Sequence, residues 1–256
     1  MLKSVSADNI TDAGANRVRI IASDRLDGNR THSAQDDSPD WHRLNSAHEA
    51  ILKDLPRSFA TILIDPPWRF ANRTGKIAPE HKRLHRYPTM SFEEIAELPV
   101  SKLALPNSHL YLWSPNALLL EALTIMKEWG FTYKTNIVWY KVRKDGGPDG
   151  RGVGFYFRNV TELLLFGVKG HLRTLKPGRT QVNVMISRKQ EHSHKPEISY
   201  NIIQQCSPGP YLELFARERV SGWTQWGDQV DSYEKTRPQY AMYNGWASQP
   251  GAKSSL

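Results

Sequence analysis

Short apolar runs that stop abruptly at prolines or turn residues constrain the fold of this chain more than any other feature. The run FATILI at 59–64 is rich in β-branched residues and ends at Asp65-Pro66-Pro67, as a buried strand does. Further runs of this kind predict strands at 109–113, 131–142, 161–168, 211–216 and 221–227. The middle of the chain is therefore expected to consist largely of buried strands.

Two segments between these runs have the spacing of helices. Residues 116–129 place apolar side chains on one helical face, with Asn116 positioned to cap the start and Gly130 to end the helix. Residues 196–206 form the second expected helix. Strands that alternate with helices predict an α/β fold, a Rossmann-like, doubly wound and mostly parallel sheet with helices on both faces.

Length, cysteine content and composition limit the classes of protein to consider. The 256 residues favour one domain at 46–232, preceded by a polar, partly disordered segment at 1–45 and followed by a polar tail at 233–256. The single Cys206 excludes a disulfide framework and is interpreted as a small core residue. No run of about 18 apolar residues and no signal peptide are found, so we expect a cytoplasmic protein without membrane contact.

Positive charge is concentrated outside the N-terminal segment. Residues 1–58 hold 8 Lys and Arg against 9 Asp and Glu, whereas residues 59–256 hold 26 against 17. The ratio is 6 to 1 at 69–90 and 12 to 4 at 141–195. Such charge attracts polyanions, nucleic acid included, although a solvated basic surface explains it equally well.

The corner Asp65-Pro66-Pro67-Trp68 lies where a doubly wound sheet binds ligands, beyond the carboxyl end of a strand. Its prolines make a stiff, extended corner that presents a carboxylate, free backbone carbonyls and an indole. The exocyclic amine of adenine offers two N–H donors, which the Asp65 carboxylate and the Pro66 carbonyl can accept while Trp68 stacks on the base. A rigid turn with a buried tryptophan is the alternative interpretation.

The motifs beyond this corner occur in the order found in a known family. They are Tyr87-Pro-Thr-Met, the strands HLYLW and NIVWYK, Glu162, Gly167-Val-Lys-Gly, His194-Lys-Pro, Glu213-Leu-Phe-Ala-Arg, Gly222-Trp223 and Gly227-Asp-Gln. From Phe59 to Gln229 the sequence resembles the DPPW-type adenine N-methyltransferases, which include the catalytic subunit of the messenger-RNA adenosine methyltransferase and bacterial and phage DNA enzymes. The resemblance implies a circularly permuted methyltransferase fold, with the catalytic corner before the cofactor-binding half.

The same resemblance implies S-adenosylmethionine as the methyl donor and gives roles to individual residues. The implied catalytic residues are Asp65, Pro66, Pro67 and Trp68. Asp65 is implied to bind the amino group of the donor, and Lys195 its carboxylate. The other residues implied to bind the donor are Arg217, Arg219, Asp228 and Gln229. Those implied around the target base are Tyr87, Trp139, Lys141 and Glu162. Because the family's non-catalytic partner subunits lack the acid, an intact Asp65 implies an active subunit, although Asp228 replaces a usual Asn.

Two basic loops are expected to contact the substrate. In the long loop 69–90, the residues expected to bind phosphates around a flipped adenine are Arg73, Lys76, Lys82, Arg83 and Arg86. Residues 141–158 form the opposing wall, where Arg151 and Arg158 contact the substrate strand. A solvated loop without substrate contact is the alternative for 69–90.

Two weaker motifs are set aside. Gly150 to Gly154 resembles a dinucleotide fingerprint but lacks the strand before it and the helix after it. His192 and His194 lack a third ligand at suitable spacing, so no metal is expected.

The sequence therefore predicts an S-adenosylmethionine-dependent methyltransferase that modifies N6 of adenine in DNA by direct methyl transfer. DNA is favoured because the chain lacks zinc fingers, RNA-binding modules and the long extensions of RNA enzymes, and so resembles bacterial or phage-encoded enzymes. Two alternatives stay open: an RNA adenosine methyltransferase, and a nucleic-acid-binding subunit that needs a partner. A homodimer, a heterodimer and an accompanying restriction enzyme are also left open.

Overall fold

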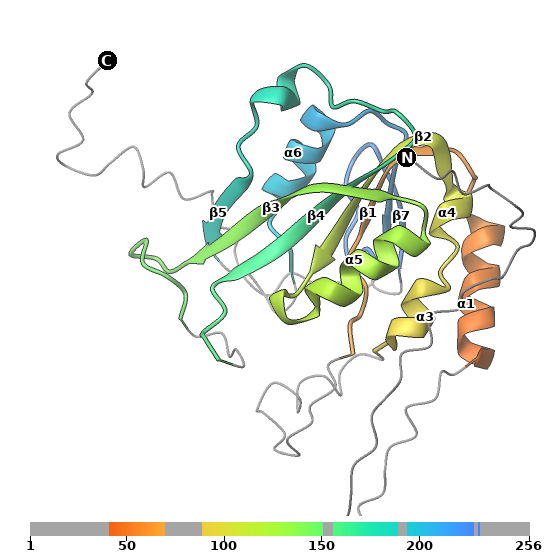
Figure 1. Ribbon diagram of the computed structural model, residues 1–256, viewed down its shortest axis with the longest axis horizontal. Coiled ribbons are helices and arrows are strands. Elements are labelled where there is room, and N and C mark those ends of the chain that lie inside the picture. Colours follow the sequence, from red (N-terminus) through yellow and green to blue (C-terminus); the bar gives the residue numbers. More distant parts are fainter. Residues whose placement is uncertain (1–40, 70–88, 151–155, 189–193, 228–229, 231–256) are drawn as a thin grey trace, which may run out of the picture. The chain divides into compact units, whose positions relative to one another are not determined.

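The computed structural model describes residues 41–69, 89–150, 156–188, 194–227 and 230, without the side chains of 41–47. A seven-stranded sheet in the order β5-β3-β4-β2-β1-β6-β7 forms the centre of this part (Figure 1). Its strands are β1 (Phe59–Ile64), β2 (Ala104–Ser114), β3 (Thr132–Val142), β4 (Thr161–Lys169), β5 (Val184–Arg188), β6 (Tyr211–Leu214) and β7 (Trp223–Trp226). Only the two pairings made by β4 are antiparallel. The sheet is mostly parallel, as the sequence predicts.

Helices cover both faces of the sheet. They are α1 (Trp41–Asp54), α3 (Phe92–Ala96), α4 (Val100–Leu103), α5 (Leu119–Glu128) and α6 (Ile198–Cys206), with two 3-10 turns, η1 (Asn116–Leu118) and η2 (Pro177–Thr180). Successive strand side chains point to opposite faces, so Ile62 and Ile64 pack into one hydrophobic cluster and Leu63 into another. The first cluster takes side chains from α1, α3, α4 and α5, and the second takes them from α6 (Figure 1). This is a doubly wound α/β arrangement.

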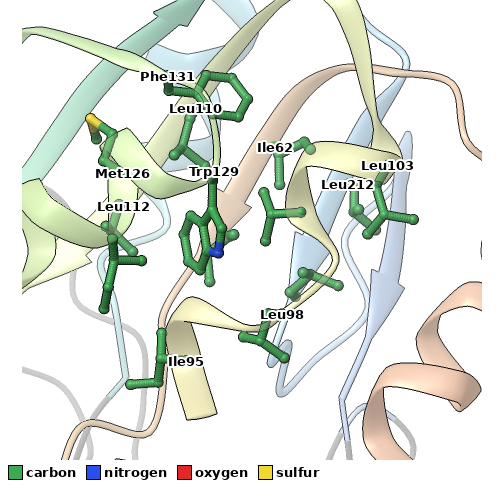
Figure 2. Close-up of a cluster of buried hydrophobic side chains, with 14 of the residues drawn as sticks. Ile62, Ile95, Leu98, Leu103, Leu110, Leu112, Met126, Trp129, Phe131 and Leu212 are labelled. Carbon is green, nitrogen blue, oxygen red and sulfur yellow. The ribbon is translucent and has the colours of Figure 1, made fainter. Parts of the chain in front are cut away.

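The first cluster surrounds Trp129, which follows α5 (Figure 2). Trp129 is 2% exposed, and its Nε1 donates to the Ala96 carbonyl at 3.0 Å, so its polar atom is satisfied. Burial of one large apolar side chain contributes roughly 1.5–3 kcal/mol to folding. Ile62 of β1 and Leu110 of β2 are buried in the same cluster as Trp129. The cluster thus fixes α3 and α5 against the strands whose ends carry the polar residues described below.

Several elements differ from the prediction. β2 begins at Ala104, and the strand predicted to reach 216 ends at Leu214, before a residue with positive φ. Asn116 does not cap α5, since it begins η1 and its Nδ2 donates to the Thr161 carbonyl at 3.1 Å. The sequence did not indicate α1, α3, α4 or β5. The predicted polar ends lie outside the described residues, except for the start of α1.

The sheet register brings several strand ends to one side of the sheet. Ile64 at the end of β1 pairs with Leu112 of β2 and with Leu214 of β6. Because β4 runs the other way, it begins on this side, where Glu162 pairs with Trp139 of β3. We call this side the carboxyl edge. It is where parallel α/β sheets bind ligands.

Candidate functional site

Two carboxylates and two lysines form a continuous chain of ion pairs at the carboxyl edge. The Lys195 Nζ lies 2.9 Å from Oδ2 of Asp65 and 2.8 Å from Oε1 of Glu162, and the Lys141 Nζ lies 2.8 Å from Oε2 of Glu162. All four side chains are between 15% and 22% exposed. They come from the end of β1, from β3, from β4 and from the segment before α6, so only the folded sheet brings them together.

The partners of these groups, and not burial alone, set their charges. Burial favours the neutral form of Glu162, but the ammonium groups of Lys195 and Lys141 outweigh it and lower the pKa of Glu162 to about 2. Burial also opposes the charge of Lys195, yet Asp65 and Glu162 raise its pKa. For Asp65, burial prevails over the attraction of Lys195 and raises the pKa. Glu162 is therefore firmly ionised, whereas Asp65 takes up a proton more readily than an ordinary aspartate.

Two buried tryptophans lie beneath the lysines. The Lys195 Nζ is 5.2 Å from the ring centre of Trp113, and the Lys141 Nζ is 4.5 Å from that of Trp139, both within the range of cation–π attraction. Trp139 is 2% exposed and donates from Nε1 to Oγ of Ser187 at 2.9 Å. Trp139, predicted to lie around the target base, therefore supports Lys141 from within the core.

The Asp65-Pro66-Pro67-Trp68 corner differs from the prediction in two respects. Trp68 is 7% exposed, and its Nε1 donates to the Trp113 carbonyl at 3.1 Å, so the ring packs in the core and is not an open plate for a base. The alternative interpretation, a turn with a buried tryptophan, describes it better. Nor are the carbonyls free, since that of Pro66 accepts from the Trp68 N–H at 2.8 Å and that of Pro67 from the Met90 N–H at 2.9 Å.

Comparisons with known proteins identify the family of this chain. The model of the MT-A70 family matches residues 59–229, more than half of the chain. The chain belongs to the MT-A70 family. It is 26% identical over 199 residues to the type II methyltransferase M.MunI of a Mycoplasma species, a match that covers 71% of this chain and 82% of that relative.

Two human relatives are longer proteins. The N(6)-adenine-specific methyltransferase METTL4 is 30% identical over 204 residues, which are 72% of this chain and 40% of METTL4. The N(6)-adenosine-methyltransferase catalytic subunit METTL3 is 27% identical over 184 residues, which are 70% of this chain and 30% of METTL3. The chain thus spans less than half of the length of either human relative.

The MT-A70 match contains the whole sheet and all four members of the ion-pair chain. It begins at Phe59, the first residue of β1, and continues past the end of β7. The family resemblance and the α/β class predicted from the sequence are confirmed. The roles of individual residues stay predictions.

The loop after β6 contains a strained backbone. Phe215 has φ 63°, a conformation that bulky residues rarely adopt and that often occurs at functional sites. Gly227 lies directly against the backbone of Ala216, where a Cβ would collide. Arg217 is partly buried, and its charge acts on Asp65 by lowering the pKa of that carboxyl, against burial. Arg219 is exposed.

A second polar cluster adjoins the site, and the sequence did not indicate it. Glu213 of β6 accepts from the Tyr200 hydroxyl at 2.9 Å and from Nε2 of Gln225 at 2.6 Å. We call Glu213, Tyr200 and Gln225 the neutral cluster, because these two hydrogen-bond partners of the carboxyl are uncharged. Burial raises the pKa of Glu213 to about 7, and the charge of Asp65 adds to this effect.

Nine predicted site residues lie outside the described residues. They are Arg73, Lys76, Lys82, Arg83, Arg86, Tyr87, Arg151, Asp228 and Gln229. Arg158 is described and is exposed, and His194 pairs through Nε2 with Glu218 at 2.9 Å. Within the described ranges, no three His, Cys, Asp or Glu side chains gather as metal ligands, and no helix has the length and apolar character needed to cross a bilayer.

Proposed function

We propose that this chain transfers a methyl group from S-adenosylmethionine to the N6 amino group of adenine in DNA. The observation that carries the proposal is the position of Asp65. This carboxylate follows β1 directly at the carboxyl edge, inside the MT-A70 match, and Lys195 lies 2.9 Å from it. A carboxylate held at the ligand-binding edge of such a sheet is suited to orient and polarise a substrate amine.

Asp65 would act by accepting an N–H of adenine's exocyclic amine. The lone pair of that nitrogen is delocalised into the ring, and a carboxylate acceptor supports the positive charge that develops during attack. The Pro66 carbonyl already accepts from Trp68, but its oxygen has a second lone pair for the other N–H. Pro67 and Trp68 would hold the corner in place, with Trp68 tied to the Trp113 carbonyl.

The polar groups at the carboxyl edge fit the methyl donor. S-adenosylmethionine, when bound, supplies a methyl group on a positively charged sulfur. Its carboxylate suits Lys195, which has three N–H donors and two carboxylate partners, and its amino group suits Asp65. Arg217, Arg219, Asp228 and Gln229 are proposed to hold its ribose and adenine.

Glu162 would position the site, since its two oxygens accept from Lys195 and Lys141. Lys141 would contact the target base, together with Tyr87, above the buried Trp139. The basic side chains of loop 69–90, with Arg151 and Arg158, would bind the phosphates. This arrangement would leave Glu162 ionised throughout the reaction.

The choice of DNA rests on the resemblance to bacterial and phage enzymes. The match to the type II methyltransferase M.MunI supports it, since 82% of that relative is covered, against 30% of METTL3. An RNA substrate is the competing assignment, because the name of METTL3 gives adenosine as its substrate. This chain is 27% identical to METTL3 and 26% identical to M.MunI, so identity does not separate the two.

The test is transfer of a labelled methyl group by the purified chain to adenine-containing duplex DNA and to matched RNA. We expect label on N6 of DNA adenine. Asp65→Asn should lose about 10²–10⁴-fold in turnover and keep most of its affinity for S-adenosylmethionine. The control is Lys169→Met, whose Nζ contacts Ser101 away from the ion-pair chain and which should retain parental turnover.

Each other outcome has a definite meaning. Label on RNA alone would contradict the DNA assignment and keep the reaction. Donor binding without transfer to either substrate would point to a subunit that needs a partner. Parental turnover in Asp65→Asn would show that the role assigned to Asp65 is wrong.

A further inference from the structure

Two aromatic side chains are almost fully in solvent close to the site. Tyr156 is 95% exposed and Phe157 is 86% exposed, whereas the exposed aromatic Tyr133 reaches only 39%. Aromatic side chains bury about 150–250 Å² when they pack and contribute strongly to cores and interfaces. These two rings add little to the packing of the described residues, which favours a role in binding.

The sheet ladder fixes where this aromatic pair lies. The Lys141 N–H donates to the Val160 carbonyl at 2.8 Å, so β3 and the start of β4 stay paired just beyond Glu162. Tyr156 and Phe157 come directly before this paired stretch. The carboxyl end of β3 and the start of β4 both reach the carboxyl edge, and the connection between them leaves the sheet there (Figure 1). The aromatic pair is therefore carried by the connection that enters β4 beside Lys141 and Glu162, at the rim of the carboxyl edge.

Charge around the aromatic pair favours a polyanion as its partner. Arg158 follows Phe157, and Lys144 lies on the other arm of the same connection, both exposed. The nearby acid Asp145 is already bonded to the Arg143 guanidinium at 3.1 and 2.9 Å. Aromatic rings beside basic side chains are the usual means of holding a single nucleic-acid strand, with bases stacked on the rings and phosphates on the cations.

We infer that Tyr156 and Phe157 stack on nucleobases of the substrate strand next to the target adenine, with Arg158 at a neighbouring phosphate. The inference rests on the proposed function. A base that is extruded for chemistry leaves its neighbours without a stacking partner. The exposed rings replace that contact at the rim and hold the strand while its adenine lies at Asp65.

The test measures affinity for an adenine-containing oligonucleotide. The double variant Tyr156→Leu with Phe157→Leu keeps apolar bulk and removes the aromatic faces, so we expect at least about fivefold weaker binding for each ring that stacks. The exchange variant, Tyr156→Phe with Phe157→Tyr, should bind like the parent. Tyr133→Leu is the matched control, since Tyr133 is an exposed aromatic at the opposite end of β3.

Two further readouts separate stacking from charge and from misfolding. The leucine variant should keep the parental salt dependence and S-adenosylmethionine affinity, whereas Arg158→Ala should lower the salt slope by about one. Parental oligonucleotide affinity in the leucine variant would overturn the inference. A changed oligomeric mass with unchanged affinity would overturn it in favour of a protein interface. A parent chain that neither binds nor methylates nucleic acid would instead contradict the proposed function itself.

Discussion

Glu162, which is partly buried, and Glu213, which is buried, lie at the same sheet edge, and their pKa values differ widely. Glu162 has two ammonium partners, and its pKa falls to about 2. Glu213 accepts from a hydroxyl and an amide, and its pKa rises to about 7. Both are desolvated, so the charge of the partners decides which carboxyl is ionised. The edge thus holds one acid that is ionised above about pH 2 and another that titrates near neutral pH.

The two glutamates are expected to affect stability in opposite pH ranges. The pKa of Glu162 is below the usual 4.5, so its contribution is complete above pH 4.5 and is lost as the pH falls toward 2. The pKa of Glu213 is above 4.5, so its contribution is present below pH 4.5 and is lost as the pH rises through 7. Variants that remove one partner at a time can test this contrast.

Among the variants that test this contrast, the largest effect is expected from Lys195→Met, which removes the cation shared by Asp65 and Glu162. Loss of one partner leaves a desolvated carboxylate, so we expect the free energy of unfolding to fall by roughly 3 kcal/mol. Turnover should fall by about 10²–10³-fold, because a positioned charge at the site is lost. Urea unfolding and the methyl-transfer assay measure the two effects.

A matched control keeps this result specific. Lys169→Met also removes a lysine near an aromatic ring, but that Nζ contacts Ser101 oxygens and no carboxylate in the contacts described. Lys169→Met should therefore lower the free energy of unfolding and the turnover less than Lys195→Met does. Equal losses in the two variants would contradict the special role given to the ion-pair chain.

The next effect is expected from Glu213→Gln, and it develops only as the pH rises. Glutamine resembles the protonated acid, and it can turn its amide oxygen to Gln225 and its NH₂ to the Tyr200 hydroxyl. The parent loses stability as Glu213 ionises between pH 4.5 and 7, by up to about 3 kcal/mol, and the variant does not. Relative to the parent, the variant should therefore gain stability from pH 4.5 to pH 8.

Urea unfolding at both pH values gives this difference directly, and Glu128→Gln, on the exposed face of α5, serves as the control. A parent-to-variant difference that stays constant with pH would show that Glu213 does not titrate in this range.

Six of the seven strands in the described sheet, all but β5, were predictable because their signals are local. FATILI marks β1 at its observed bounds, since a fully apolar run followed by two prolines has few other structures. The missed helix α3 also had a local signal, because Ser91-x-x-Glu94 is a capping-box sequence and forms that box in the structure. Its five residues are too few for helical periodicity to show. α1 was missed because its sequence is mostly polar, although Ile51 and Leu55 are buried.

The partners of the site residues were not predictable in this way. Asp65 and Lys195 are far apart in the sequence, and only sheet topology places their atoms 2.9 Å apart. Whether Trp68 packs inward or faces a ligand depends on Trp113, from another strand. The sequence therefore locates the carboxyl edge, whereas the charge on each acid requires the fold.

The smallest effect is expected from Tyr200→Phe, which removes one donor from Glu213 and keeps the ring against Trp223, 5.3 Å away. Below pH 7 the acceptor is mainly a neutral acid, so the loss should be about 1 kcal/mol. Above pH 7 the acceptor is a carboxylate, and bonds to charged groups contribute about 1.5–3 kcal/mol. Urea unfolding of parent and variant at pH 5 and pH 8 should therefore give a larger difference at pH 8. An equal difference at both pH values would mean that Glu213 keeps one charge state between pH 5 and pH 8. Glu213 and Glu162 would then differ in their hydrogen-bond partners but not in whether they titrate in this range.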